Sequence, residues 1–80
     1  SNGLEEEIVN QPVAMYPNPT RGSVYFSKAV EDVQVQDLNG RTVLEGSGKS
    51  LDVSTLSTGV YWIQAQDKSG TRLRFKLIRE

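Results

Sequence analysis

Asp37 and Asn39 have the spacing of the first two alternate oxygen ligands in a calcium-binding loop. The rest of that pattern fails. The next ligand position holds Arg41, the position that needs glycine holds Thr42, and the closing glutamate position holds Gly48. We therefore expect Asp37 to accept hydrogen bonds from the amides of a turn, and we expect no metal or other cofactor.

The other candidate catalytic and metal-binding residues also lack the partners that such sites need. Glu31 and Asp32 are sequence neighbours, and neighbouring side chains on a strand point to opposite faces instead of converging across a cleft. The chain has no histidine and no cysteine, which excludes a catalytic triad, an imidazole base and thiolate ligands from within it. We expect Glu31 and Asp32 to be turn residues, and we expect the protein not to be an enzyme.

Length and charge narrow the choice of partners. The 80 residues form one domain, and nine basic residues against ten acidic ones leave a formal net charge of −1. Such a charge gives no general attraction to nucleic acid or anionic lipid, and no apolar run approaches the ~20 residues that cross a bilayer. We expect a monomer that neither binds nucleic acid nor inserts into a membrane.

The pattern of apolar residues predicts an all-β protein. Short alternating runs are separated by Gly, Pro, Asn and Ser every eight to twelve residues or so, which is typical of an antiparallel β-sandwich of about seven short strands. Residues 1–11 read as a linker ahead of a folded domain at 12–80. The predicted strands are at about 12–16, 23–27, 33–38, 41–45, 50–53, 59–66 and 71–79.

Alternation also predicts which side of each strand is buried, because successive side chains point to opposite faces. The last strand gives the clearest pattern, with Arg72, Arg74 and Lys76 outward and the apolar residues between them inward. The predicted core consists of Val24, Phe26, Val33, Val35, Tyr61, Ile63, Ala65, Leu73, Phe75 and Leu77.

Proline and glycine predict where the chain turns. Pro17 and Pro19 favour extended backbone in the residue before each and cannot donate to a ladder, so we expect the chain to leave its sheet there as an extended segment. Asn39-Gly40 predicts a hairpin with a type I′ turn, in which both residues have positive φ. Gly59 is expected at a strand entry that needs positive φ or a close backbone approach.

Two groups of side chains predicted on the outer faces of the strands allow more than one interpretation. Trp62 and Tyr25 have the chemistry to stack on sugars, although half-buried packing against the N-terminal lead-in or against a neighbouring long side chain is favoured. The basic row Arg72, Arg74 and Lys76 either protects a sheet edge from aggregation or recognises a partner, and the two roles are compatible.

Four motifs follow one another along the chain. They are Pro17-Asn18-Pro19 after Tyr16, Asp37-Leu38-Asn39-Gly40-Arg41, Leu56-Ser57-Thr58-Gly59-Val60-Tyr61, and the final Lys76-Leu77-Ile78-Arg79. In this order the chain, from about Pro12 to Glu80, resembles the C-terminal sorting domain of cargo proteins exported by the bacterial type IX secretion system. The resemblance implies an Ig-like antiparallel β-sandwich at the C-terminus of a larger secreted protein.

The resemblance also implies the partners and the functional residues. The partners are the outer-membrane type IX machinery, its surface sortase, which cuts the domain off, and an N-terminal cargo domain that is exported to the cell surface or the medium. The alternative is an Ig-like accessory module that binds carbohydrate or spaces the domains of a surface protein. The implied recognition residues are Pro17, Asn18, Pro19, Asp37, Asn39, Gly40, Arg41, Gly59, Tyr61, Arg72, Arg74 and Lys76, the last matching the family's recurrent lysine.

Overall fold

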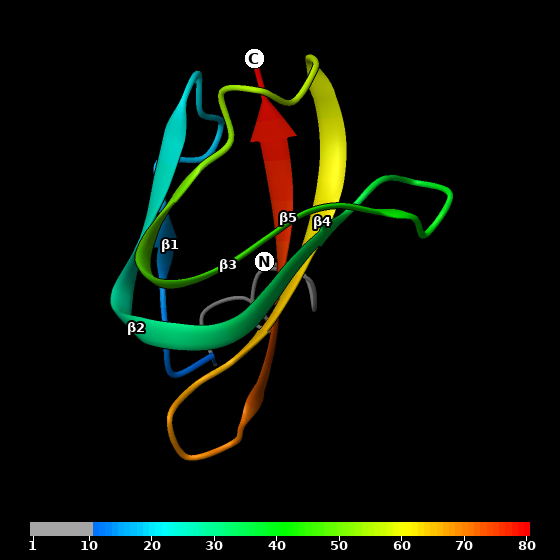
Figure 1. Ribbon diagram of the computed structural model, residues 1–80. Helices are drawn as coiled ribbons and strands as arrows, with labels where there is room; N and C mark the ends of the chain where they lie inside the picture. Colours follow the sequence, from blue (N-terminus) through cyan, green and yellow to red (C-terminus); the bar gives the residue numbers. More distant parts are fainter. Residues whose placement is uncertain (1–10) are drawn as a thin grey trace, which may run out of the picture.

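The computed structural model describes residues 11–80, which form one antiparallel β-sheet that curls on itself (Figure 1). The prediction of an all-β protein is confirmed. The prediction of about seven short strands is wrong, because the described residues form five strands, two of them long. The strands are β1 (Met15–Tyr16), β2 (Ser23–Gln36), β3 (Thr42–Asp52), β4 (Gly59–Gln66) and β5 (Arg72–Arg79).

β2 and β3 each unite two of the predicted strands. Their pairing shifts register between Tyr25 and Val30 and again between Val30 and Val33. Within the second of these intervals Asp32 has a φ of 52°. Such irregularities are β-bulges, which bend a strand pair without ending it. Glu31 and Asp32 therefore lie inside β2, and the prediction that they are turn residues is wrong.

The strand order explains the curl of the sheet. The order is β1-β2-β4-β5, with β3 paired to β2. The chain after β1 closes the curl at the far end, where Thr20 forms a parallel bridge with Arg79. There the N–H of Thr20 donates to the carbonyl of Ile78 at 2.9 Å, and the N–H of Glu80 donates to the carbonyl of Thr20 at 2.8 Å. The segment after β1 thus lies beside the end of β5.

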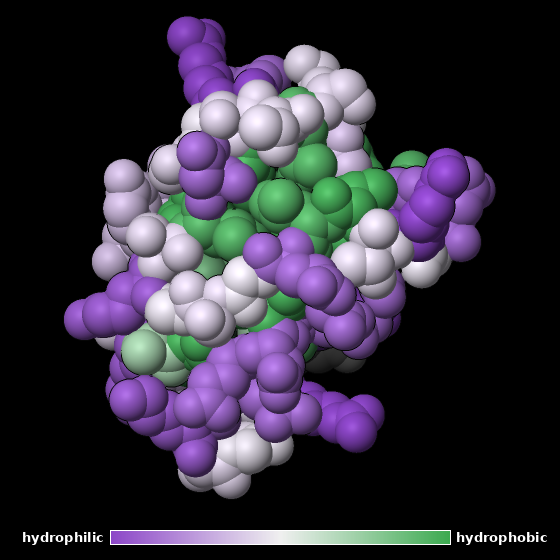
Figure 2. Space-filling view, in the orientation of Figure 1, coloured by the Kyte–Doolittle hydropathy of each residue, from purple (hydrophilic) through white to green (hydrophobic). Residues whose placement is uncertain are grey.

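The inner side of the curled sheet holds the hydrophobic core. Every predicted core residue is buried, and the rings of Phe26 and Phe75 pack with their centroids 5.8 Å apart. Alternation did not reveal the further buried residues Val13, Val30, Leu51 and Val53. Figure 2 shows that hydrophobic side chains remain visible on the face that β3 crosses, surrounded by hydrophilic ones.

The boundary between linker and domain is described in part. Residues 1–10 of the predicted linker lie outside the described residues. The side chain of Gln11 contacts β5, because its Oε1 accepts the backbone N–H of Arg74 at 2.7 Å. In residues 11–80 no helix is long and apolar enough to cross a membrane.

Candidate functional site

The Pro17-Asn18-Pro19 motif packs beside β5. The Tyr16–Pro17 and Asn18–Pro19 peptide bonds are cis. β1 ends at Tyr16, so the chain leaves its sheet at the prolines as predicted, but Asn18 and Pro19 form a bend and the prediction of an extended segment is wrong. The Nδ2 of Asn18 donates to the carbonyl of Lys76 at 2.6 Å, and its Oδ1 accepts the N–H of Ile78 at 2.9 Å. One carboxamide therefore binds two backbone groups that a neighbouring strand would otherwise bind.

These contacts cover much of the outer edge of β5. β5 is the last strand in the order, and its N–H and C=O groups would be unpaired on the side away from β4. Gln11 binds the N–H of Arg74, Asn18 binds the carbonyl of Lys76 and the N–H of Ile78, and the backbone of Thr20 pairs with Ile78 and Glu80. From Arg74 to the C-terminus, the chain's own N-terminal segment thus shields the edge from strand addition.

The basic row of β5 lies on the outer face of the sheet, as predicted. Arg72, Arg74 and Lys76 are all exposed. The guanidinium carbon of Arg74 lies 4.2 Å from the ring centroid of Trp62, which is a cation–π geometry. Trp62 is half-buried, so the expected packing against a neighbouring side chain is confirmed. Arg74 and Arg72 also line a hollow of about 540 Å³ together with glutamines of β2 and β4, namely Gln34, Gln64 and Gln66.

The Asp37–Arg41 segment is the turn of the β2–β3 hairpin. The N–H of Gly40 donates to the carbonyl of Asp37 at 3.0 Å, and the N–H of Asp37 donates to the carbonyl of Arg41 at 2.9 Å. Gly40 has a φ of 85°, whereas among the described residues the only non-glycine with positive φ is Asp32. The hairpin is confirmed, but the type I′ prediction is wrong. The loop has three residues and ends in a glycine bulge.

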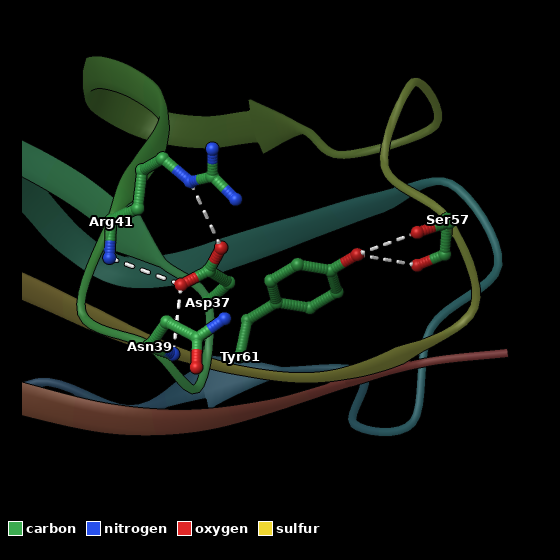
Figure 3. A network of polar contacts seen from close by, with 5 residues as sticks. All are labelled: Asp37, Asn39, Arg41, Ser57 and Tyr61. Atoms are coloured by element: carbon green, nitrogen blue, oxygen red, sulfur yellow. Dashed lines mark hydrogen bonds and ion pairs between the residues drawn. The ribbon is translucent and has the colours of Figure 1, made fainter.

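The carboxylate of Asp37 holds this turn together (Figure 3). Its Oδ1 accepts the N–H groups of Asn39 at 2.9 Å and of Arg41 at 3.0 Å, and its Oδ2 lies 3.5 Å from the Nε of Arg41. The hydrogen bond from the Arg41 amide is the largest cause that lowers the pKa of Asp37. The prediction that Asp37 accepts hydrogen bonds from turn amides is confirmed.

A second turn repeats the first one. In the β4–β5 hairpin the Oδ1 of Asp67 accepts the N–H groups of Ser69 at 3.0 Å and of Thr71 at 2.9 Å, while Gly70 donates to the carbonyl of Asp67 at 3.0 Å. Gly70 has a φ of 89°. The sequence signal for this turn is the repeated Asp-x-x-Gly spacing, from Asp37 to Gly40 and from Asp67 to Gly70. The hydroxyl of Ser69 is the largest cause that lowers the pKa of Asp67.

Tyr61 fastens the loop before β4. Its hydroxyl donates to the carbonyl of Ser57 at 2.7 Å and lies 3.1 Å from the hydroxyl of the same residue (Figure 3). β4 begins at Gly59, as expected. Gly59 has a φ of 158°, a positive value that other residues rarely adopt, so the expected positive φ is confirmed. A Cβ there would lie 4.0 Å from the Tyr61 ring, which is ordinary contact. The expected close approach at Gly59 is therefore absent.

Arg79 is a structural residue that the sequence pattern did not single out. Its Nε donates to the carbonyl of Val53 at 3.1 Å, and its Nη2 donates to the carbonyl of Ser54 at 3.2 Å. These bonds tie the end of β5 to the loop after β3. No local signal could have found this role, because the acceptors are backbone atoms more than 20 residues away along the chain.

The motif residues therefore form two groups. Asn18 meets Lys76 beside the basic row, and Asp37, Asn39, Gly40 and Arg41 share one turn, while Tyr61 contacts Ser57 instead of either group. Within the described part of the chain, no three His, Cys, Asp or Glu side chains are grouped as a metal site requires. Charged and amide groups on a sheet surface suit recognition by non-covalent contact.

Comparisons with known proteins identify the family. Neither the curated proteins nor the solved structures contain a match to this chain. A family model described as secretion system C-terminal sorting domain matches residues 14–80. This range includes all four motifs and all five strands. The chain belongs to this family of C-terminal sorting domains, which act as the signal that directs a cargo protein through the type IX secretion system.

Proposed function

We propose that the export machinery recognises the folded domain through the basic row Arg72, Arg74 and Lys76. The observation that supports this most is the covering of the outer edge of β5 by Asn18 and its neighbours. Charged side chains on an edge strand usually prevent edge-to-edge aggregation, but a covered edge needs little such protection. We therefore take recognition of a partner as the main role of the three exposed cations, beside the packing of Arg74 on Trp62.

The contacts of Trp62 favour this function over a carbohydrate-binding accessory module. A sugar platform needs the open face of an aromatic ring, and the guanidinium of Arg74 lies over the ring of Trp62. Tyr16 and Tyr25 form an exposed aromatic pair, with exposures of 51% and 47%, but their planes are tilted by 32° to each other. A tilted pair does not offer the flat surface on which a sugar ring stacks.

The remaining steps of delivery follow from membership in the family. The domain is fused to an N-terminal cargo that is carried across the outer membrane. We propose that a surface sortase then removes the domain by cutting in or upstream of residues 1–11, ahead of the folded part. The folded part, residues 12–80, stays intact, and the cargo ends at the cell surface or in the medium. The domain itself has no enzymatic role.

We also propose that the curled sheet is a form of the Ig-like sandwich. β2 pairs with β1 and β3 near its start and with β3 and β4 near its end, so one bent strand serves both layers. The hydrogen bond from Tyr61 near the start of β4 to the carbonyl of Ser57 resembles the tyrosine corner of Ig-like domains. Both observations support the assignment.

An export assay tests the proposed recognition. Residues 10–80 are fused behind a signal peptide and a periplasmic reporter in a bacterium with a type IX system. The unaltered fusion is expected outside the cell, with the reporter shortened by about the mass of the domain. The variant Arg72→Ser/Arg74→Ser/Lys76→Ser is expected to fold but to stay in the periplasm.

A second triple variant provides the matched control. Lys28, Lys49 and Lys68 are exposed cations elsewhere on the domain, and replacing all three by serine removes the same charge. We expect this control to be exported normally. Normal export of the β5 variant, or an equal loss of export in both variants, would show that the export machinery does not recognise the basic row.

A further inference from the structure

We infer that Leu38, at the tip of the β2–β3 hairpin, is an apolar anchor that inserts into a pocket of the export machinery. Leu38 is 69% exposed, the highest value among the large hydrophobic residues that are exposed in the described chain. The hairpin that carries it projects from the body of the molecule (Figure 1). This inference deepens the proposed function and rests on it.

The second turn shows that the hairpin does not need leucine at this position. Asp37–Arg41 and Asp67–Thr71 share the same backbone and carboxylate hydrogen bonds, each with a glycine at positive φ. The residue that follows the aspartate is Leu38 in one turn and Lys68 in the other. Because a charged residue fits the same geometry, the apolar side chain is not required for folding.

The turn also orders the backbone at Leu38 before any partner binds. The carboxylate of Asp37 accepts two amide N–H groups, one of them from the residue directly after Leu38. Because the backbone is already ordered, burial of this side chain by a partner costs side-chain entropy but little backbone entropy. Single apolar residues that fill a partner's pocket often dominate the binding energy.

The pairing of the strands connects Leu38 with the basic row. Gln36 pairs with Trp62, and Trp62 pairs with Lys76. Neighbouring strands lie about 4.8 Å apart, so Gln36 and Lys76 are separated by roughly 10 Å. The turn begins at the residue after Gln36. One partner surface is therefore large enough to contact Leu38 and the basic row together.

The charges around Leu38 define the kind of partner. Arg41, in the same turn, has a side chain that is 76% exposed, and Lys76 lies two strands away. The complementary surface is a protein pocket with an apolar interior and carboxylates at its rim. We assign this pocket to an outer-membrane component of the type IX machinery.

Paired variants of the two turns test the inference in the export assay. Leu38→Ser is expected to reduce the exported reporter roughly tenfold or more, because loss of a dominant anchor reduces affinity at least that much. Lys68→Ser, at the same position of the second turn, is expected to be exported like the unaltered chain. Melting curves of the purified variants should match, since both turns keep their aspartate and glycine.

Crosslinking gives an independent measurement that does not depend on stability. A photoreactive benzoylphenylalanine at position 38 is expected to capture an outer-membrane export component, identified by mass spectrometry, and the same probe at position 68 is not. Normal export of a folded Leu38→Ser variant, or equal capture from both positions, overturns the inference alone. Failure of the unaltered fusion to leave the periplasm overturns the proposed function and this inference with it.

Discussion

The side-chain oxygen of Asn18 accepts the backbone N–H of Ile78 at 2.9 Å, across 60 positions of sequence. The nitrogen of the same side chain donates to the carbonyl of Lys76. The carboxamide of Asn18 thus makes hydrogen bonds that a neighbouring strand would make at the edge of β5. The Pro17-Asn18-Pro19 motif and β5 are therefore joined by the two hydrogen bonds of one side chain. The position of the motif thus depends on β5, and the edge of β5 depends on the motif for its hydrogen bonds.

The variant Asn18→Ala should lower the free energy of unfolding by about 1–2 kcal/mol, because each of its two hydrogen bonds contributes roughly 0.5–1.5 kcal/mol. Urea denaturation followed by circular dichroism measures this change. Asn39 reaches Asp37 through its backbone N–H, so Asn39→Ala is the matched control and should stay within about 0.5 kcal/mol. Equal effects of the two variants would contradict the role given to Asn18.

The two faces of β5 should respond differently to substitution. Phe75 is buried against Phe26, so Phe75→Ala should cost about 3–5 kcal/mol and unfold much of the protein at room temperature. The serine variant of Arg72, Arg74 and Lys76 should keep the fold, with the loss of the Arg74–Trp62 contact costing about 0.5–1 kcal/mol. Far-ultraviolet circular dichroism and chemical denaturation distinguish the outcomes. A stable Phe75→Ala protein would refute the assignment of the core face.

Gly40 should tolerate substitution less than Gly22, although nothing lies within 4 Å of a Cβ at either position. The φ of Gly40 is 85°, a conformation that costs other residues about 1–2 kcal/mol. We expect Gly40→Ala to lower the free energy of unfolding by that amount. Gly22→Ala should have no such cost, and a smaller loss at Gly40 than at Gly22 would argue against the bulged turn.

Stability should fall in acid. The pKa values of Asp37, Asp52 and Asp67 are lowered in the folded protein, mainly by hydrogen bonds from the Arg41 amide, the Ser54 hydroxyl and the Ser69 hydroxyl, respectively. Folding therefore favours the ionised form. This stabilisation is complete above the unfolded pKa of about 3.9 and is lost as the pH falls through the lower folded values.

Thermal melts at a series of pH values measure this effect. The melting temperature should be nearly constant above about pH 5 and should decrease below about pH 4. In the double variant Asp37→Asn/Asp67→Asn the amide oxygen still accepts hydrogen bonds, but the side chain no longer titrates. We expect a shallower decrease in acid for this variant, and an unchanged acid slope would exclude these two aspartates as its source.

The sequence by itself determined the faces of the strands and the positions of the hairpins. Leu73, Phe75 and Leu77 are buried because alternate residues of any strand point to opposite sides, whatever the strand pairs with. The β2–β3 hairpin is equally local. An aspartate that binds the amides two and four residues ahead, followed by a glycine at positive φ, folds from five consecutive residues.

Only the tertiary structure decided how the strands continue and how the sheet closes. The polar stretch before Val33 has the composition of a turn, yet β3 pairs with β2 on both sides of it, so the chain bends there without leaving the sheet. The contacts of Asn18 with β5, and of Arg79 with the loop after β3, join distant backbone groups. Local patterns cannot specify such pairs, because they form only where the curled sheet brings its two ends together.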